Sequence, residues 1–309
     1  MDRQSGLMRG VLAGPEHVAI VSGARQGITL LGRVLAAAGT RTVAVELPSL
    51  PQHADSLRAA GLDVVGVRVD GDGIDVERLA ASGAGAVVVT PAHQFPLGVA
   101  LTPERRAALL AWVVAAPGRL VIEDDYDAEF RYDRRPVGVL QARDTDRVAY
   151  LGSASKTLAP GLRLGWVVAR DPLRRLLVRE KALDDHGSPA LDQLALARLL
   201  DNAGYDRHIR LARRRYRARR DALAAALAAE LPDARLEGLA AGLHAIARLP
   251  RPFDVDALTA AAAARGVGVY PLGRRGGTAD ALTMGYAGLP EPAIAEGVRL
   301  LAEAFATLA

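Results

Sequence analysis

Short β-branched runs alternate with Ala- and Leu-rich stretches of helical spacing along roughly the first 200 residues of the chain. Short apolar runs are typical of buried strands, and apolar residues repeated every three or four positions are typical of amphipathic helices. Regular alternation of the two predicts an α/β fold, with a mostly parallel sheet covered by helices on both faces. The seven predicted strands are Val18–Val21, Thr42–Val45, Val64–Val69, Ala86–Thr90, Leu120–Glu123, Val148–Leu151 and Leu164–Val168.

The pattern changes near residue 200. A long helical stretch, Tyr205–Leu231, is followed by shorter runs that return to a βαβ-like alternation. These runs are a strand at Leu243–Arg248, a helix at Asp254–Arg265, strands at Val267–Tyr270 and Leu282–Tyr286, and a closing helix after Pro290. We predict a large domain over residues 1–200, and the long helix with a smaller C-terminal α/β domain over residues 201–309.

Composition limits the class of protein. With 309 residues, 50% of them hydrophobic, the chain can bury a full core. The sequence has no apolar run of about 18 residues and no signal-peptide layout at its start, so we expect a cytoplasmic protein without a membrane partner. The absence of cysteine excludes disulfides, cysteine metal sites and thiol chemistry.

One dense basic run stands out from the modest net charge of +4: Arg213–Arg215 with Arg217, Arg219 and Arg220. Such a run could contact nucleic acid. It lies within the long helical stretch, where a solvated helix face is the simpler interpretation. We therefore expect no nucleic-acid partner for this chain.

A segment rich in polar side chains, Gly152–Arg163, directly follows one predicted strand. Open α/β folds bind ligands at this carboxyl edge of the sheet. A partly desolvated lysine there, Lys156, can act as an amine nucleophile toward an aldehyde. Ser153, Ser155 and Arg163 offer the donors that a phosphate requires. A polar loop with a surface lysine is the alternative interpretation.

Two further segments follow strands in the same way. Val121–Tyr132, which contains Glu123–Tyr132, is an apolar strand end that changes abruptly to acids and an aromatic, and buried acids need a partner. A magnesium site or a solvated strand end is the alternative, although the chain lacks the GxxxxGK[ST] phosphate loop. Ser22–Gly27 opens a helix whose free N–H groups can hold a phosphate. A Gly turn before a helix is also common for structural reasons alone.

These three segments, together with Thr90–Gly98, resemble in order and spacing the aminotransferase-like domain of MocR-type regulators, within the fold type I enzymes that use pyridoxal 5′-phosphate. The resemblance covers nearly the whole chain. It implies a Schiff base between the cofactor and Lys156, and Asp124 at the pyridine nitrogen. It also implies Tyr126 at the 3-hydroxyl of the ring. Asp124 in that place keeps the ring protonated, so that the ring withdraws electrons from the substrate.

The resemblance also implies the remaining cofactor contacts. Those at the phosphate are Ser22, Gly23, Ala24, Gln26, Ser153, Ser155 and Arg163, and those near the ring are His93 or Gln94.

Two positions depart from the family pattern. Leu50 stands where a tyrosine usually stacks on the cofactor ring, so apolar contact would replace stacking. Thr283 stands where ordinary aminotransferases of this fold carry the arginine that pairs with the α-carboxylate of the substrate. Arg274 or Arg275 in the preceding loop is the candidate substitute, with an exposed loop arginine as the alternative.

Two functions remain open. The first is an enzyme that transaminates or otherwise transforms an amino acid or amine; the second is an effector domain whose reaction with the ligand changes its shape without turnover. MocR-type regulators carry a winged-helix domain ahead of this region, whereas here Met1 lies about twenty residues before the first motif. We therefore favour the enzyme. The resemblance further implies a homodimer with the cofactor near the subunit boundary.

Overall fold

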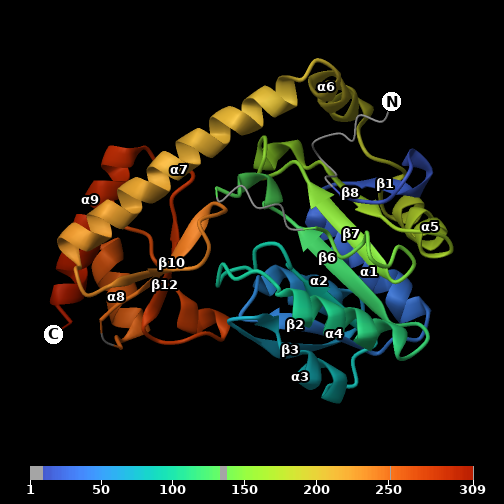
Figure 1. The fold of residues 1–309 in the computed structure, drawn as a ribbon, viewed down its shortest axis with the longest axis horizontal. Helices are drawn as coiled ribbons and strands as arrows, with labels where there is room; N and C mark the ends of the chain where they lie inside the picture. The colour runs from blue at the N-terminus through green and yellow to red at the C-terminus, as the bar shows by residue number, and fades with distance from the viewer. Residues whose placement is uncertain (1–9, 133–137, 251, 309) are drawn as a thin grey trace.

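The computed structural model describes residues 10–132, 138–250 and 252–308, and of Ala128 and Arg275 only the backbone. Its first part is an eight-stranded sheet in the order β1-β8-β7-β6-β5-β2-β3-β4 (Figure 1). The strands are β1 (Val18–Val21), β2 (Thr42–Leu47), β3 (Asp63–Asp70), β4 (Gly73–Ile74), β5 (Ala86–Val89), β6 (Leu120–Asp125), β7 (Val148–Ser153) and β8 (Gly165–Val168). All seven predicted strands are present. The eighth, β4, is a two-residue strand that folds back on β3, too short to give a sequence pattern.

The strand directions bring several carboxyl ends to one edge of the sheet. Strands β2, β3, β5, β6 and β7 are joined by parallel pairs. Strand β8 pairs antiparallel with both β7 and β1, so β1 runs in the same direction as β7. The segments that follow β1, β2, β5, β6 and β7 therefore begin at the same edge, as the predicted mostly parallel sheet requires.

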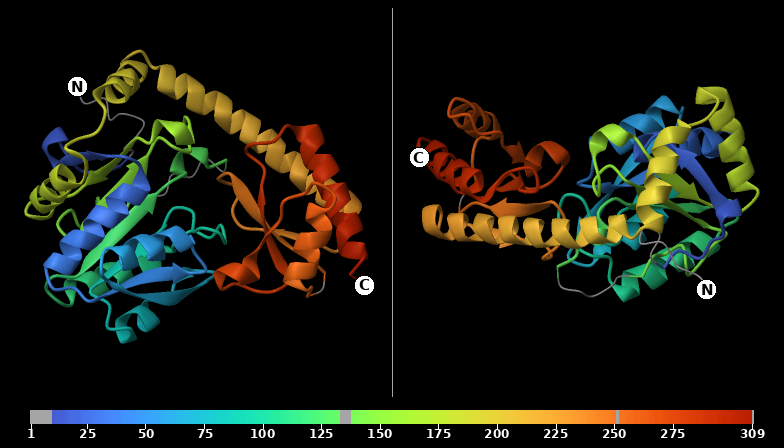
Figure 2. Two further views of the ribbon diagram at one scale, coloured as in Figure 1. Left: turned by 180° about the vertical axis from the view of Figure 1, so that it is seen from behind. Right: turned by 90° about the horizontal axis from the view of Figure 1, so that it is seen from above.

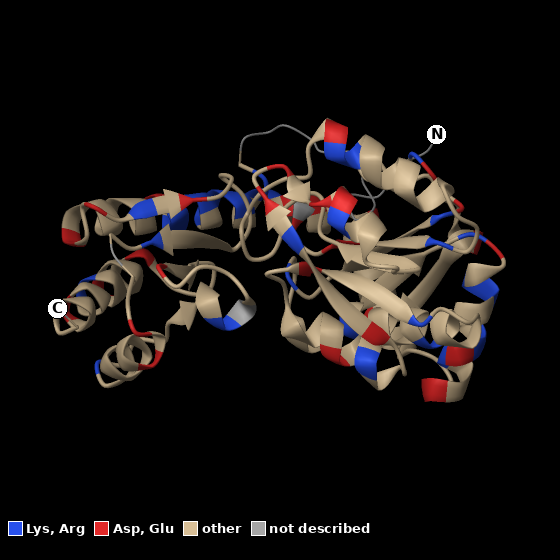
Figure 3. Cartoon of the chain, turned by 90° about the horizontal axis from the view of Figure 1, so that it is seen from below, with Lys and Arg blue, Asp and Glu red and all other residues tan. Residues whose placement is uncertain are grey.

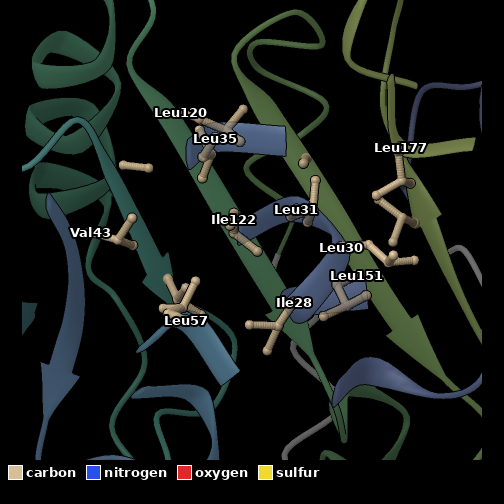
Figure 4. Close-up of a cluster of buried hydrophobic side chains, with 14 of the residues drawn as sticks. Ile28, Leu30, Leu31, Leu35, Val43, Leu57, Leu120, Ile122, Leu151 and Leu177 are labelled. Atoms are coloured by element: carbon tan, nitrogen blue, oxygen red, sulfur yellow. The ribbon is translucent and has the colours of Figure 1, made fainter. Parts of the chain in front are cut away.

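Helices cover both faces of this sheet. They are α1 (Ala24–Ala37), α2 (Pro51–Ala59), α3 (Val76–Ala81), α4 (Pro103–Val114) and α5 (Leu173–Asp185). On one face α1 contributes Ile28 and Leu31 to a core that includes Ile122 and Leu151 of the sheet (Figure 4). On the other face, side chains of α3 and α4 share a second core with the sheet. Each fully buried aliphatic side chain contributes about 1.5–3 kcal/mol, so these two layers supply most of the stability of this part.

The second part contains a four-stranded sheet in the order β11-β12-β10-β9. Its elements, with the helices that lead into it, are α6 (Ala190–Asp201), α7 (Gly204–Glu230), β9 (Arg235–Glu237), β10 (His244–Arg248), α8 (Val255–Ala263), β11 (Tyr270–Pro271), β12 (Ala281–Gly285) and α9 (Glu291–Ala306). Every strand pair in it is antiparallel, so the βαβ-like alternation of the sequence does not produce parallel pairs. The reason is that β12 lies between β10 and β11 and runs antiparallel to both, so β10 and β11 do not pair with each other.

One face of the small sheet packs on helices and the other faces the large sheet. Ala245, Ala247 and Leu282 join a core with α7, α8 and α9. On the opposite face, Ile246 packs with Leu97 of the large part. Figure 2 shows the small sheet beside the large one, with α7 connecting the two parts. The division at residues 200 and 201 stays a prediction.

The basic run lies along α7 (Figure 3). Arg214, Arg215 and Arg217 are exposed, as expected for a solvated face. Arg213 and Arg219 instead donate hydrogen bonds to the backbone carbonyls of Glu129 and Ala287, so they serve packing. None of the described helices is long and apolar enough to cross a membrane.

Candidate functional site

The strand register brings the three polar segments together. Asp124 of β6 pairs with Leu151 of β7, and Ser153 at the end of β7 pairs with Gly165. Gly165 pairs in turn with Val21, the last residue of β1. The segments that carry Asp124, Lys156 and Ser22 therefore lie on consecutive parts of one sheet edge.

A helix N-terminus and a guanidinium meet at this edge. Gly27 N–H makes a bond of 3.3 Å to the Gly23 carbonyl, so the N–H groups of the preceding α1 residues have no intrahelical partner. Arg163 donates to the Ser22 carbonyl at 2.8 Å. A Cβ atom on Gly23, whose φ is +82°, would lie only 3.0 Å from the Arg163 guanidinium. Glycine thus lets a cation approach free N–H groups, an arrangement suited to a phosphate.

The hydroxyl loop after β7 is held in a compact turn. The Ser153 hydroxyl accepts a hydrogen bond of 3.1 Å from the Ser155 N–H. Lys156 follows, is exposed, and has no hydrogen-bond or ion-pair partner within the described part of the chain. The sequence contains two lysines, and the other, Lys181, is buried and lies 2.6 Å from the Asp185 carboxylate. Lys156 is therefore the lysine whose amine is available for chemistry.

Asp124 is almost fully buried, with one oxygen paired and the other without a partner. Its Oδ2 lies 3.2 Å from Nε2 of His53, whereas its buried Oδ1 has no hydrogen-bond partner. A buried acceptor without a partner costs about 1–3 kcal/mol, so Oδ1 fits a ligand that brings an N–H donor. A protonated pyridine nitrogen is such a donor.

Sequence analysis did not identify His53. It lies one helical turn after Leu50, and this spacing is the only sequence signal that places His53 on the same side of α2 as Leu50. Leu50 itself lines a small pocket beside His53, with Phe95 and Val88 among the other lining residues. The replacement of the expected tyrosine thus makes this wall of the site aliphatic.

Tyr126 belongs to a buried polar cluster formed with histidines. Its hydroxyl lies 3.1 Å from Nδ1 of His93, and the same nitrogen lies 2.8 Å from Oδ2 of Asp127. His244 of β10 lies beside His93, with ring centroids 5.3 Å apart, and contacts the Pro96 carbonyl at 3.1 Å. Burial and the neighbouring His93 lower the pKa of His244 to about 4, so His244 is neutral at neutral pH. Burial likewise raises the pKa of Tyr126 far above its usual value.

Two predicted cofactor ligands have their side chains engaged elsewhere. The Gln94 amide donates to the carbonyls of Pro48 at 2.8 Å and Phe95 at 2.7 Å, which ties together the loops after β2 and β5. The Gln26 amide donates to Asp184 and Asp185 of α5. Any contact of Gln26 with a phosphate would therefore use its backbone N–H.

The candidates for a carboxylate site do not form one in the described structure. The side chain of Thr283 is buried and its hydroxyl has no partner. Arg274 is exposed and pairs with Asp256 of α8. The side chain of Arg275 lies outside the described part of the structure.

Several acids of β2, β6 and the segment after β6 have pKa values raised by burial. Burial raises the pKa of Glu46, Glu123 and Glu129 to about 7 in each case. Glu46 accepts a hydrogen bond of 2.6 Å from the Thr90 hydroxyl. Asp125, whose pKa is also raised by burial, accepts one of 2.9 Å from Tyr150. Among the described residues, no group of three or more acids and histidines is arranged to hold a metal ion.

Comparison with known proteins shows the family of this chain. A model described as aminotransferase class I and II matches residues 7–274. The chain belongs to this family. The family match covers both the phosphate-type cradle at Gly23 and the Lys156 loop.

Known proteins similar to this chain fall into two groups by their names. Among regulators, the uncharacterized HTH-type transcriptional regulator YdeL of Bacillus subtilis is 33% identical over 96% of this chain. The probable rhizopine catabolism regulatory protein MocR of Rhizobium meliloti is 32% identical over 97% of it. The chain spans only 65% and 62% of the length of these two relatives.

Among enzymes, the crystal structure of LysN, an α-aminoadipate aminotransferase of Thermus thermophilus, is similar with a TM-score of 0.85. The two proteins are 30% identical, and the match covers 95% of this chain and 78% of LysN. That crystal structure contains N-(5′-phosphopyridoxyl)-L-leucine. The likeness confirms the fold type I architecture for this chain.

Proposed function

We propose that this chain binds pyridoxal 5′-phosphate at the sheet edge and uses it to transaminate an amino acid or a related amine. The observation that carries the proposal is the buried, unpartnered Oδ1 of Asp124, on the strand next to the one that leads to Lys156. The cradle formed by Gly23 and Arg163 suits the phosphate. LysN supports the choice of ligand, because its bound molecule contains a phosphopyridoxyl group.

Each residue has a defined task in this proposal. When bound, the cofactor supplies an aldehyde that captures an amine and a ring that withdraws electrons. Arg163 and the N–H groups at the start of α1 would hold the phosphate. Asp124, positioned by His53, would accept a hydrogen bond from the protonated ring nitrogen, and the Tyr126 hydroxyl would serve the ring oxygen. Lys156 Nζ would hold the aldehyde carbon and, as a free amine, would move the proton at the α-carbon of the substrate.

The experiment that tests this function mixes purified, cofactor-loaded protein with a panel of amino acids and a keto acid acceptor. Absorbance changes report reaction of the amine, and chromatography reports a new keto acid. We expect at least one amino acid to change the spectrum and to yield product that Lys156→Ala does not form. Absence of any spectral change over the whole panel would contradict the proposal.

The second candidate is the effector domain of a regulator without turnover. It is favoured by one observation, namely that relatives named as regulators, YdeL and MocR, match 96% and 97% of this chain. In the same experiment it predicts a spectral change with a specific amino acid but no keto acid product.

We further propose a cytoplasmic homodimer with the cofactor near the subunit boundary. Leu183 of α5 and Leu191 and Leu194 of α6 are 72%, 81% and 64% exposed, and such apolar side chains are typical of surfaces that a partner covers. Light scattering at high protein concentration should give twice the chain mass. A monomer that still holds the cofactor would contradict the dimer.

A further inference from the structure

The Gln26 side chain connects the phosphate cradle to helix α5 through hydrogen bonds at both ends of its amide. Its Oε1 accepts a bond of 2.7 Å from the Ser22 N–H and lies 3.4 Å from Nζ of Lys181. Its Nε2 donates bonds of 2.8 Å to Asp184 and 2.9 Å to Asp185. Donors thus surround the oxygen and acceptors surround the nitrogen, so only one orientation of the amide satisfies all partners.

The partners on α5 are costly for that helix alone. Asp184 and Asp185 lie in the last turn of α5, where the helix macrodipole disfavours negative charge. Both are compensated by cations: Arg33 of α1 lies 2.8 Å from Asp184, and Lys181 of α5 itself lies 2.6 Å from Asp185. Through Arg33 and the Gln26 amide, the two aspartates therefore connect α5 to α1.

The protonation states are fixed in the working range of pH. Burial opposes ionisation of Asp185, but hydrogen bonds from Gln26 and Lys181 outweigh it and lower its pKa to about 2. Asp184 also has a lowered pKa, chiefly because of its hydrogen bond from Arg33. Both carboxylates accept bonds at neutral pH, so the connection does not loosen by titration there.

Ser22 is the residue through which this connection reaches the cradle. Gln26 holds its N–H, while its carbonyl accepts the bond from Arg163. The next residue, Gly23, leaves room for the Arg163 guanidinium, which a Cβ atom at that position would approach to 3.0 Å. If the Gln26 amide is removed, the Ser22 peptide is free to rotate, and Arg163 and the first N–H groups of α1 lose their fixed relation.

We infer that Gln26, clamped by Lys181, Asp184 and Asp185, is a positioning residue for the cofactor phosphate: its side chain fixes the Ser22 turn so that Arg163 and the start of α1 converge on one anion. This inference rests on the proposed function. The Gln26 side chain thus acts on the phosphate through Ser22 and Arg163 and does not contact the phosphate itself.

The test compares two ligands that differ only in the phosphate. Dissociation constants for pyridoxal 5′-phosphate and for pyridoxal are measured by absorbance titration for the parent, Gln26→Leu and Asp185→Asn. Gln193→Leu is the matched control, because Gln193 of α6 bonds only to the carbonyls of Ser188 and Pro189. We expect Gln26→Leu to weaken pyridoxal 5′-phosphate binding about tenfold, and pyridoxal binding less than twofold.

The second variant acts from the other helix. Asp185→Asn keeps the size of the side chain and should give the same selective loss, about threefold, while Gln193→Leu should match the parent for both ligands. Parent-like binding of pyridoxal 5′-phosphate by both Gln26→Leu and Asp185→Asn would overturn the inference, as would equal loss for the two ligands. A parent that binds neither ligand would instead remove the proposed function, and with it the inference.

Discussion

At the scale of single residues, the proposed chemistry depends on how Asp124 is held inside the protein. Its Oδ2 is paired with His53, and the buried Oδ1 is left for a ligand. A carboxylate kept in this way stabilises a positive charge on a ring nitrogen, and that charge stabilises the transition state for proton loss from the substrate.

Asp124→Asn should separate binding from chemistry. Asparagine keeps the size of the side chain but removes the charge, while Arg163 and Lys156 still hold the cofactor. We expect the cofactor to remain bound, and exchange of the α-proton of a reactive amino acid in deuterated solvent to slow by about a thousandfold, or about 4 kcal/mol. If the variant exchanges this proton as fast as the parent, Asp125 or Asp127 becomes the candidate partner of the ring.

The residues predicted from the sequence are those in contiguous motifs. Lys156, Asp124 and Arg163 lie in segments whose residue types already indicate amine, acid and phosphate chemistry. His53 and His244 come from segments that carry no such motif, and only the tertiary fold brings them to Asp124 and His93. The sequence also could not show that the Gln26 side chain turns toward α5.

At the scale of elements, the turn that opens α1 is the proposed site for the phosphate. Gly23 and Gly39 lie at opposite ends of this helix, and both have positive φ, +82° and +88°. Only at Gly23 would a Cβ atom approach another group, since none lies within 4 Å of the corresponding position at Gly39.

Gly23→Ala and Gly39→Ala therefore form a matched pair. Both should lose about 1–2 kcal/mol of stability because alanine is strained at positive φ. Only Gly23→Ala should displace the Arg163 guanidinium and raise the dissociation constant for pyridoxal 5′-phosphate, by about tenfold in absorbance titrations. Equal weakening by the two substitutions would show that the effect is general and not located in the cradle.

Helices and strands with a clear apolar pattern could be predicted from the sequence, whereas strands of two or three residues could not. The buried strands β5 and β7 form uninterrupted apolar runs, and their burial on both faces explains the pattern. Strand β4 has two residues, too few for periodicity, and β11, predicted over Val267–Tyr270, contains only Tyr270 and Pro271. The antiparallel small sheet escaped prediction because the alternation of strands and helices does not specify strand order.

At the scale of the whole molecule, buried carboxyl groups make stability depend on pH. Burial raises the pKa of Glu46 and Glu123 from 4.5 to about 7. Between these values the folded state keeps protons that the unfolded state has released, so the free energy of unfolding falls as pH rises. His244, with its pKa lowered from 6.5 to about 4, acts in the opposite direction in the window between those two values. Because two such carboxyl groups oppose one histidine, the net effect is that the free energy of unfolding falls as pH rises.

Glu46→Gln should flatten this dependence. It removes one group that takes up a proton on folding, so the decrease in unfolding free energy between pH 5 and 8 should be smaller than in the parent by about 1–3 kcal/mol. Urea unfolding at fixed cofactor concentration measures the difference. Glu291→Gln, at an exposed position on α9, should keep the parental slope. Identical slopes for all three proteins would show that Glu46 is ionised in the folded state.

The assignment of the cofactor to Lys156 is tested by borohydride reduction of the cofactor-loaded protein, followed by peptide mass spectrometry. The chain has two lysines, and Lys181 is buried against Asp185, whereas Lys156 is exposed at the sheet edge beside the phosphate cradle. We predict one phosphopyridoxyl group per chain, on Lys156, and none in Lys156→Ala. A label on Lys181 or on the terminal amine, or no label at all, would contradict this assignment and the function built on it.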